Sequence, residues 1–156
     1  MRHLAILSGV LIALTACQSG SPDGVTSVPG HGAVAIQIVP NPIVATSVSG
    51  KTYEFPFEVV VRETGGRPVN VTRVSATVVA PGGITLARES WDAERIRSMG
   101  YSTSLNPFGE ARYRFTPRRE VPDERLFGGV AAELKLDAVD DTGQVASATT
   151  RVTITR

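Results

Sequence analysis

Residues 130–154, VAAELKLDAVDDTGQVASATTRVTI, decide the fold of this chain of 156 residues. Small or apolar side chains occupy every second position on both sides of a central Asp-Asp-Thr-Gly segment: Val130, Ala132, Leu134, Leu136 and Ala138 before it, and Ala146, Ala148, Thr150, Val152 and Ile154 after it. Alternation with a period of two places one face of a strand in a core, and Asp and Gly favour turns. The stretch therefore predicts a β-hairpin with one buried face.

The same alternation extends upstream through the chain. We expect strands in the segments 34–38, 53–61, 69–79, 84–88 and 111–115. The sequence Pro40-Asn41-Pro42 ends the first of these strands. The short segment 43–48 that follows is expected to change sheets. Pro56 has no N–H to donate, which predicts an edge position or a bulge there.

One strand carries a change of phase. Val69 and Val71 are out of step with Val74 and the alternating residues that follow it. A bulge adds one residue to a strand and so moves the following side chains to the other face. The sequence therefore predicts a bulge near Thr72 and Arg73.

The hairpin also carries a family resemblance. The pattern Leu-x-Leu-x-Ala-x-Asp-x-x-Gly over residues 134–143, with a last strand rich in Thr and Val, resembles the closing hairpin of bacterial immunoglobulin-like, fibronectin-III-like and PKD-like domains. The resemblance covers the last quarter of the chain. It implies an all-β fold, an antiparallel immunoglobulin-like β-sandwich of about seven to eight strands. The single cysteine permits no disulfide within the chain, so packing must hold the sandwich together.

The N-terminus has the features of a secretory signal. Met1-Arg2-His3 precedes an apolar run over residues 4–14, which is well short of the ~20 residues that a membrane-spanning helix needs. The tetrapeptide Leu14-Thr15-Ala16-Cys17 resembles the lipobox of bacterial lipoproteins. That resemblance implies that the Cys17 thiol receives a diacylglyceryl group and becomes the mature N-terminus. The alternative is an ordinary cleaved signal in which Cys17 is incidental.

These features divide the chain into three parts. Residues 1–16 are expected to be a lipoprotein signal peptide, residues 17–32 a lipidated N-terminus and flexible tether rich in Gly, Ser and Pro, and residues 33–156 the sandwich domain. The lipid would anchor the protein to the cell envelope of a Gram-negative-type bacterium. Gln18 directly after the cysteine implies, by the same resemblance, the outer membrane.

Charge and composition argue against several functions. Loss of Arg2 with the signal leaves 15 Lys and Arg against 15 Asp and Glu, which argues against nucleic acid as a partner. Of the two histidines, His3 lies in the signal and His31 in the expected tether, so no general base is expected on the sandwich. We therefore expect no enzyme activity, no cofactor and no zinc site.

Charged clusters have an ordinary interpretation and a functional one. Asp137, Asp140 and Asp141 have oxygen ligands suited to calcium, but an Asp-rich turn is the simpler interpretation. Glu54 and Glu58 share one strand face about 13–14 Å apart, too far for a glycosidase pair. The arginines Arg112, Arg114, Arg118, Arg119 and Arg125 alternate with acids, which favours paired surface charges over a basic patch.

Alternation lapses over residues 91–108, where binding function would lie. We expect a short helix between Asp92 and Met99, capped by Ser90 or Asp92. Trp91, Tyr101 and Phe108 are the candidate contact residues for a protein or glycan partner. Two functions follow: a lipid-anchored module with a binding or structural role, or an accessory or inhibitor domain that acts on another envelope protein through this loop. The alternative is that the rings close one end of the sandwich.

Overall fold

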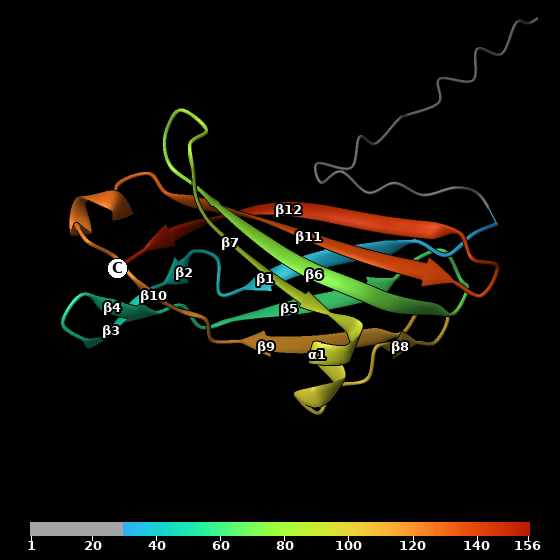
Figure 1. Cartoon of the computed structure of the whole chain (residues 1–156). Helices are drawn as coiled ribbons and strands as arrows, with labels where there is room; N and C mark the ends of the chain where they lie inside the picture. Colours follow the sequence, from blue (N-terminus) through green and yellow to red (C-terminus); the bar gives the residue numbers. More distant parts are fainter. Residues whose placement is uncertain (1–29) are drawn as a thin grey trace, which may run out of the picture.

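The computed structural model describes residues 30–156, which form two packed layers of β-sheet (Figure 1). Residues 1–29, with the expected signal peptide and Cys17, lie outside the described part. In the described residues, no helix is both long enough and apolar enough to cross a membrane.

The larger sheet has the strand order β2-β12-β11-β6-β7, and β8 also pairs with β6. Its strands are β2 (Ile43–Val44), β6 (Val69–Val79), β7 (Thr85–Asp92), β8 (Ser104–Leu105), β11 (Ala131–Asp140) and β12 (Val145–Thr155). The hairpin prediction is confirmed, since Leu134 lies opposite Thr150 and Leu136 opposite Ala148 across β11 and β12. The inward-facing leucines of β11 are fully buried, as the alternation predicts.

The opposite layer consists of two three-stranded sheets with the orders β1-β5-β9 and β10-β4-β3. Their strands are β1 (Val34–Val39), β3 (Thr46–Ser49), β4 (Thr52–Glu54), β5 (Phe57–Glu63), β9 (Glu110–Phe115) and β10 (Arg118–Glu120). Seven strands of the described chain have six residues or more, and the others are short. The fold is therefore the expected immunoglobulin-like β-sandwich.

The chain changes sheets between β1 and β2. β1 pairs with β5, whereas β2 pairs with β12, where Ile43 lies opposite Ile154. This confirms the switch expected after Pro40-Asn41-Pro42. The pairing of β2 with β12 is parallel, so the sandwich departs here from a purely antiparallel arrangement.

The bulge expected in β6 is also present. Asp137 of β11 lies opposite Arg73, but the next residue, Ala138, lies opposite Val71, so that Thr72 is the extra residue. Its hydroxyl donates a hydrogen bond to the carbonyl oxygen of Asp137 at 3.0 Å. Because of the bulge, Val71 before it and Val74 after it both face the core, although they are out of step in the sequence.

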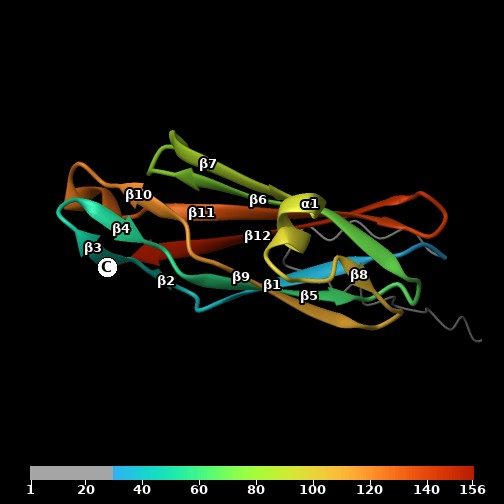
Figure 2. The ribbon, with the colours of Figure 1, turned by 60° about the horizontal axis from the view of Figure 1, so that its bottom comes forward.

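Two short helices connect the strands. Helix α1 (Ala93–Ser98) continues directly from the edge strand β7 (Figures 1 and 2), and the 3-10 helix η1 (Glu124–Phe127) follows β10. The expected cap is confirmed, because Asp92 accepts a hydrogen bond from the backbone N–H of Arg95 at 2.8 Å. Ile96 is fully buried and holds α1 against the sandwich.

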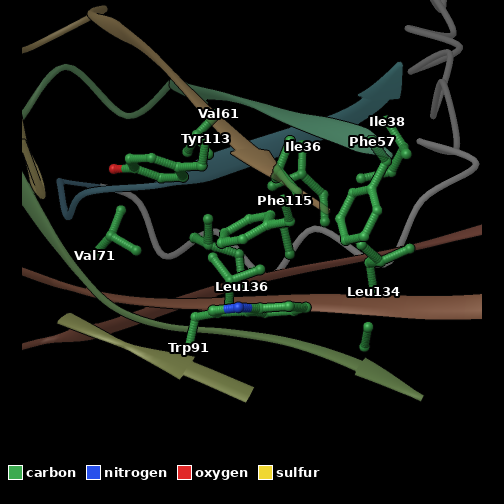
Figure 3. Close-up of a cluster of buried hydrophobic side chains, with 14 of the residues drawn as sticks. Ile36, Ile38, Phe57, Val61, Val71, Trp91, Tyr113, Phe115, Leu134 and Leu136 are labelled. Atoms are coloured by element: carbon green, nitrogen blue, oxygen red, sulfur yellow. The ribbon is translucent and has the colours of Figure 1, made fainter. Parts of the chain in front are cut away.

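The core between the layers is rich in aromatic rings (Figure 3). The ring centroid of Trp91 lies 4.2 Å from that of Phe115 and 6.1 Å from that of Phe57. Trp91, one of the candidate contact residues, is therefore a strand residue that packs in the core, since β7 extends to Asp92 and the Trp91 side chain is 3% exposed. The indole faces inward because Trp91 lies opposite the buried Val74 across β6 and β7.

Candidate functional site

The two layers enclose a cavity near the end of the sandwich where the chain terminates. Its volume is about 340 Å³, within the range of roughly 300–1,000 Å³ typical of small-molecule sites. Trp91, Ala132 and Leu134 line it from the larger sheet, and Phe55 and Phe57 line it from the opposite layer. The walls are therefore mainly aliphatic and aromatic.

The cavity lies where the opposite layer is divided. Pro56 separates β4 from β5, and Pro117 lies between β9 and β10, so both strands leave one small sheet and enter the other here. A single backbone hydrogen bond, from the Phe55 N–H to the Pro117 carbonyl oxygen at 3.0 Å, joins the two crossing points. Because the layer is not one continuous sheet, it leaves space against the larger sheet.

An ion pair between two edge strands lies at the mouth of this cavity. Glu89 on β7 is opposite the buried Ala76, and Arg119 on β10 is opposite the buried Tyr53, so both charged side chains are on inward faces. They form a salt bridge from one layer to the other. A second guanidinium, that of Arg95 in α1, lies 3.2 Å from the Glu89 carboxylate.

The Arg95 guanidinium also lies over Trp91, with its Cζ atom 5.8 Å from the ring centroid. Such a cation–π contact positions the side chain, whose Nη1 atom donates to the Glu89 carboxylate and to the carbonyl oxygen of Ser90, each at 3.2 Å. Sequence reasoning missed this cluster, because Arg95 was assigned to a loop helix and Glu89 fell outside the expected strand. The signal it overlooked is a charge at an inward position of an edge strand.

The opposite end of the sandwich contains two buried carboxylates. Glu63 accepts backbone hydrogen bonds from Ala33, Gly65, Gly66 and Phe108 at 2.6 to 3.2 Å. Burial raises the pKa of Glu63, but these four N–H donors outweigh it and lower the pKa below its ordinary value. The carboxylate thus joins the start of β1 to two loops.

Asp140 has the same role in the β11–β12 turn. Hydrogen bonds from the Thr142 hydroxyl and from backbone N–H groups, among them those of Gly32 and Gln144, hold the pKa of Asp140 well below its usual range. The other two acids of this region have separate partners, Asp137 with Lys135 and Asp141 with Arg67. Within residues 30–156 no group of three or more His, Cys, Asp or Glu side chains is arranged to hold a metal ion.

His31 lies against this turn and not in a free tether, which corrects the sequence expectation. Its Nδ1 atom is 3.4 Å from a carboxylate oxygen of Asp140 and 3.4 Å from the hydroxyl of Thr142. The Thr142 hydroxyl donates to Asp140 at 2.6 Å. Both contacts use the same ring nitrogen, so the imidazole does not connect the acid to the hydroxyl as a catalytic triad requires.

The charged face of β5, β9 and β10 consists of ion pairs, as the interleaved sequence predicts. Arg112 contacts Glu58 at 3.0 Å and Glu110 at 2.8 Å, and Arg118 contacts Glu54 at 3.0 Å. Exposed pairs of this kind contribute little to stability, typically ~0–1 kcal/mol each. The face offers no uncompensated basic patch among these residues.

The three aromatic candidates of the 91–108 segment do not form one surface. Trp91 is in the core, and Tyr101 is half-buried with its ring centroid 5.7 Å from that of Tyr113. Phe108 is 76% exposed and its backbone has a φ of 57°, a left-handed conformation uncommon for Phe. It lies against Gly66, at the end of the sandwich away from the cavity. The candidate lipidation residue, Cys17, lies outside the described residues.

Comparison with known proteins gives information on the fold. No protein-family model matches the sequence, and no curated protein matches it. Among solved structures, the structural-genomics target SoR45 has a TM-score of 0.52 at 10% identity, with 82% of this chain and 90% of that chain covered. The CARDB domain of the PF1109 protein from Pyrococcus furiosus, solved in complex with di-metal ions, has a TM-score of 0.40 at 17% identity, with coverages of 83% and 93%.

A third similar structure is the C-terminal domain of wzt, with a TM-score of 0.45 at 10% identity, and coverages of 86% of this chain and 79% of that one. At 10% identity, the similarity to SoR45 shows a shared fold alone. The strand order and the two-layer core define the chain as an immunoglobulin-like β-sandwich module.

Proposed function

We propose that this chain is a lipid-anchored module of the bacterial cell envelope that binds a ligand in the cavity between its layers and does not transform it. The observation that carries the proposal is the cavity itself, about 340 Å³ with mainly apolar walls and charged groups confined to its mouth. Largely preformed apolar pockets with a few polar groups are the usual form of small-molecule sites.

The arrangement of titratable groups supports binding over catalysis. The charged groups at the mouth, Glu89 with Arg95 and Arg119, are engaged with one another as ion pairs. His31, the histidine outside the expected signal peptide, lies at the far end of the sandwich beside Asp140. A nucleophile in the cavity would therefore have no imidazole base within reach.

The anchor rests on the tetrapeptide Leu14-Thr15-Ala16-Cys17 and on the point where the chain enters the sandwich. Arg67 contacts both Gly30 and Asp141 of the β11–β12 turn, so the described chain begins at that end of the sandwich. The cavity lining includes Ile154, near the C-terminus, which Figure 1 marks at the opposite end. The outer membrane remains the expected location, because Gln18 follows the cysteine.

An apolar fluorescent probe tests the binding function. The protein to use is residues 17–156 with Cys17→Ser, which keeps every described residue and carries no lipid of its own. Ala87 lines the cavity from β7 and is half-exposed, so Ala87→Trp should fill the mouth without disrupting the core. Ser90→Trp adds the same ring on the outward face of the same strand and is the control.

The parent protein and Ser90→Trp should enhance the fluorescence of 1-anilinonaphthalene-8-sulfonate, and Ala87→Trp should not. Equal enhancement by Ala87→Trp would show that the probe binds elsewhere and would contradict the proposal. The proposal would also be contradicted if the parent protein did not enhance the fluorescence of the probe.

The second candidate is an accessory or inhibitor domain that contacts another envelope protein through residues 91–108. One observation favours it, the 76% exposure of Phe108 on a left-handed backbone. An exposed aromatic ring on a constrained backbone costs little entropy to bury at an interface. The surface available to such a partner is centred on Phe108, since Trp91 is in the core.

A further inference from the structure

We infer that the cavity takes a single-chain amphiphile with an anionic head, of the class of a free fatty-acid carboxylate. The aliphatic tail would lie between the layers, and the head would lie at the cluster formed by Arg95, Glu89 and Arg119. The inference rests on the proposed binding function and adds the chemical class of its ligand.

The tail is matched by the walls and the size of the cavity. Side chains from both layers, among them Phe57, Trp91 and Leu134, present hydrocarbon to the space. An apolar cavity of roughly 150 Å³ is enough for benzene, and this cavity is about 340 Å³. The volume therefore suits one aliphatic chain of medium length and is too small for a lipid with two long chains.

The head is matched by the charge at the mouth. Two guanidiniums, those of Arg95 and Arg119, share the single carboxylate of Glu89. Their side chains are 54% and 49% exposed. Besides Glu89, Arg95 donates to the carbonyl oxygen of Ser90 and Arg119 to that of Arg118, which leaves further N–H groups of each guanidinium for a ligand. A second carboxylate would balance the cluster, and Arg is suited to bind it through paired N–H donors.

A cationic head has no equivalent site. The acid on the inward face of β7, Glu89, is already engaged by both arginines. Arg88 and Glu120 also flank the mouth, and their opposite charges cancel. The cluster of Glu89, Arg95 and Arg119 has two positive charges against one negative charge, and this surplus favours an anion over a cation.

Protection of sheet edges is the competing explanation for the inward charges. β7 and β10 are edge strands, and inward-pointing charged residues discourage edge-to-edge association. That explanation accounts for Glu89 and Arg119. It does not account for the second guanidinium of Arg95, or for the apolar space behind the pair.

Calorimetric titration below the micelle concentration tests the inference, with residues 17–156 carrying Cys17→Ser. The three probes are dodecanoate, dodecanol and dodecylammonium, which share a chain and differ in the charge of the head. Dodecanoate should bind about tenfold more tightly than dodecanol, a difference of about 1.4 kcal/mol. Dodecylammonium should bind most weakly.

Variants locate the head. Arg119→Gln should weaken dodecanoate about tenfold and leave dodecanol unchanged. Arg118→Gln is the matched control, since Arg118 is the adjacent residue of β10 and pairs with Glu54 on the outward face. Arg95→Gln, on α1, tests the second guanidinium independently should Arg119→Gln not fold. Ala87→Trp should abolish binding of both probes.

Two outcomes would overturn the inference of an anionic ligand, and only the second would also overturn the proposed binding function. If dodecanol binds as tightly as dodecanoate and Ala87→Trp blocks both, the anionic head is wrong and the cavity remains a binding site. If no probe binds, or if Ala87→Trp changes nothing, the cavity is not a ligand site and the proposed function fails as well.

Discussion

The carboxylate of Asp140 accepts a hydrogen bond from the backbone N–H of Gly32 at 3.0 Å, although 108 residues separate them in the sequence. Glu63 makes an equivalent bond to the N–H of Ala33 at 3.2 Å. Two buried acids from different layers thus hold adjacent residues at the point where the chain enters the sandwich. Contacts of the domain therefore begin before residue 33.

The two buried carboxylates should make the stability of the folded protein sensitive to low pH. The pKa values of Glu63 and Asp140 are lowered in the folded protein from ordinary values of 4.5 and 3.8, so the unfolded chain binds more protons in acid. Their stabilisation is fully present above those ordinary values and is lost as the pH falls below them. The free energy of unfolding, measured by chemical denaturation, should fall steadily from about pH 5 to about pH 3.

Asp140→Asn should flatten this pH dependence and lower the stability near neutral pH. Asp141→Asn is the control, since Asp141 makes an exposed pair with Arg67. A wild-type stability that is the same at both ends of this pH range would contradict the assignment.

Replacement of Phe57 tests the aromatic core. Its side chain is 5% exposed and its ring centroid lies 5.5 Å from that of Phe115. Phe57→Ala should lower the free energy of unfolding by about 3–5 kcal/mol, because it removes a buried ring and leaves a cavity. A loss below about 1 kcal/mol in urea denaturation would mean that the ring is not buried in solution.

Tyr101 and Phe108 separate the two interpretations of the 91–108 segment. The Tyr101 hydroxyl accepts a hydrogen bond from the backbone N–H of Arg114 at 3.3 Å, and its ring packs on Tyr113. We expect Tyr101→Ala to destabilise the protein by about 2 kcal/mol, roughly half the value of a fully buried ring. The free energy of unfolding of Phe108→Ala should stay within about 0.5 kcal/mol of the wild-type value, because the Phe108 ring is exposed. Thermal denaturation of Tyr101→Ala and Phe108→Ala measures both effects.

Phe108→Ala also tests the second candidate function. If an envelope protein is captured by the wild-type chain and binds through this loop, the variant should lose it while remaining folded. Capture that is unchanged in Phe108→Ala would remove the loop from consideration as the contact.

Cys17→Ser tests the lipid anchor. Because lipid modification requires the thiol, the variant in the full chain should incorporate no radiolabelled palmitate and should accumulate as uncleaved precursor. Ser19→Ala, two residues further on, is the matched control and should be labelled normally. Normal palmitate incorporation in Cys17→Ser would refute the lipobox.

Much of the fold could be predicted from the alternation of apolar and polar residues, because most strands have one buried face. The C-terminal hairpin and the bulge at Thr72 were both predicted, since a change of phase in β6 has few other causes. The full extent of β7 was not predicted from the sequence. Leu86 is exposed at 43% and Glu89 is inward on that strand, so its apolar residues do not mark its buried face.

The candidate site was not predictable for a related reason. The cavity exists because two strands leave one small sheet for another at Pro56 and Pro117, and alternation carries no information on which sheet a strand joins. The arginines of the mouth come from α1 and β10, which are far apart in sequence. Their meeting at Glu89 is a property of the tertiary structure alone.

The switch of the chain from β1 to β2 has a mechanical consequence. The described chain begins beside the β11–β12 turn, and the C-terminus lies at the opposite end of the sandwich (Figure 1), so a force that pulls these two points apart acts along the strands. Backbone hydrogen bonds between antiparallel strands run perpendicular to that direction. Tension would therefore load all six residue pairs of β1 and β5 together in shear, with the parallel β2–β12 contact as a second clamp, in place of opening one pair at a time.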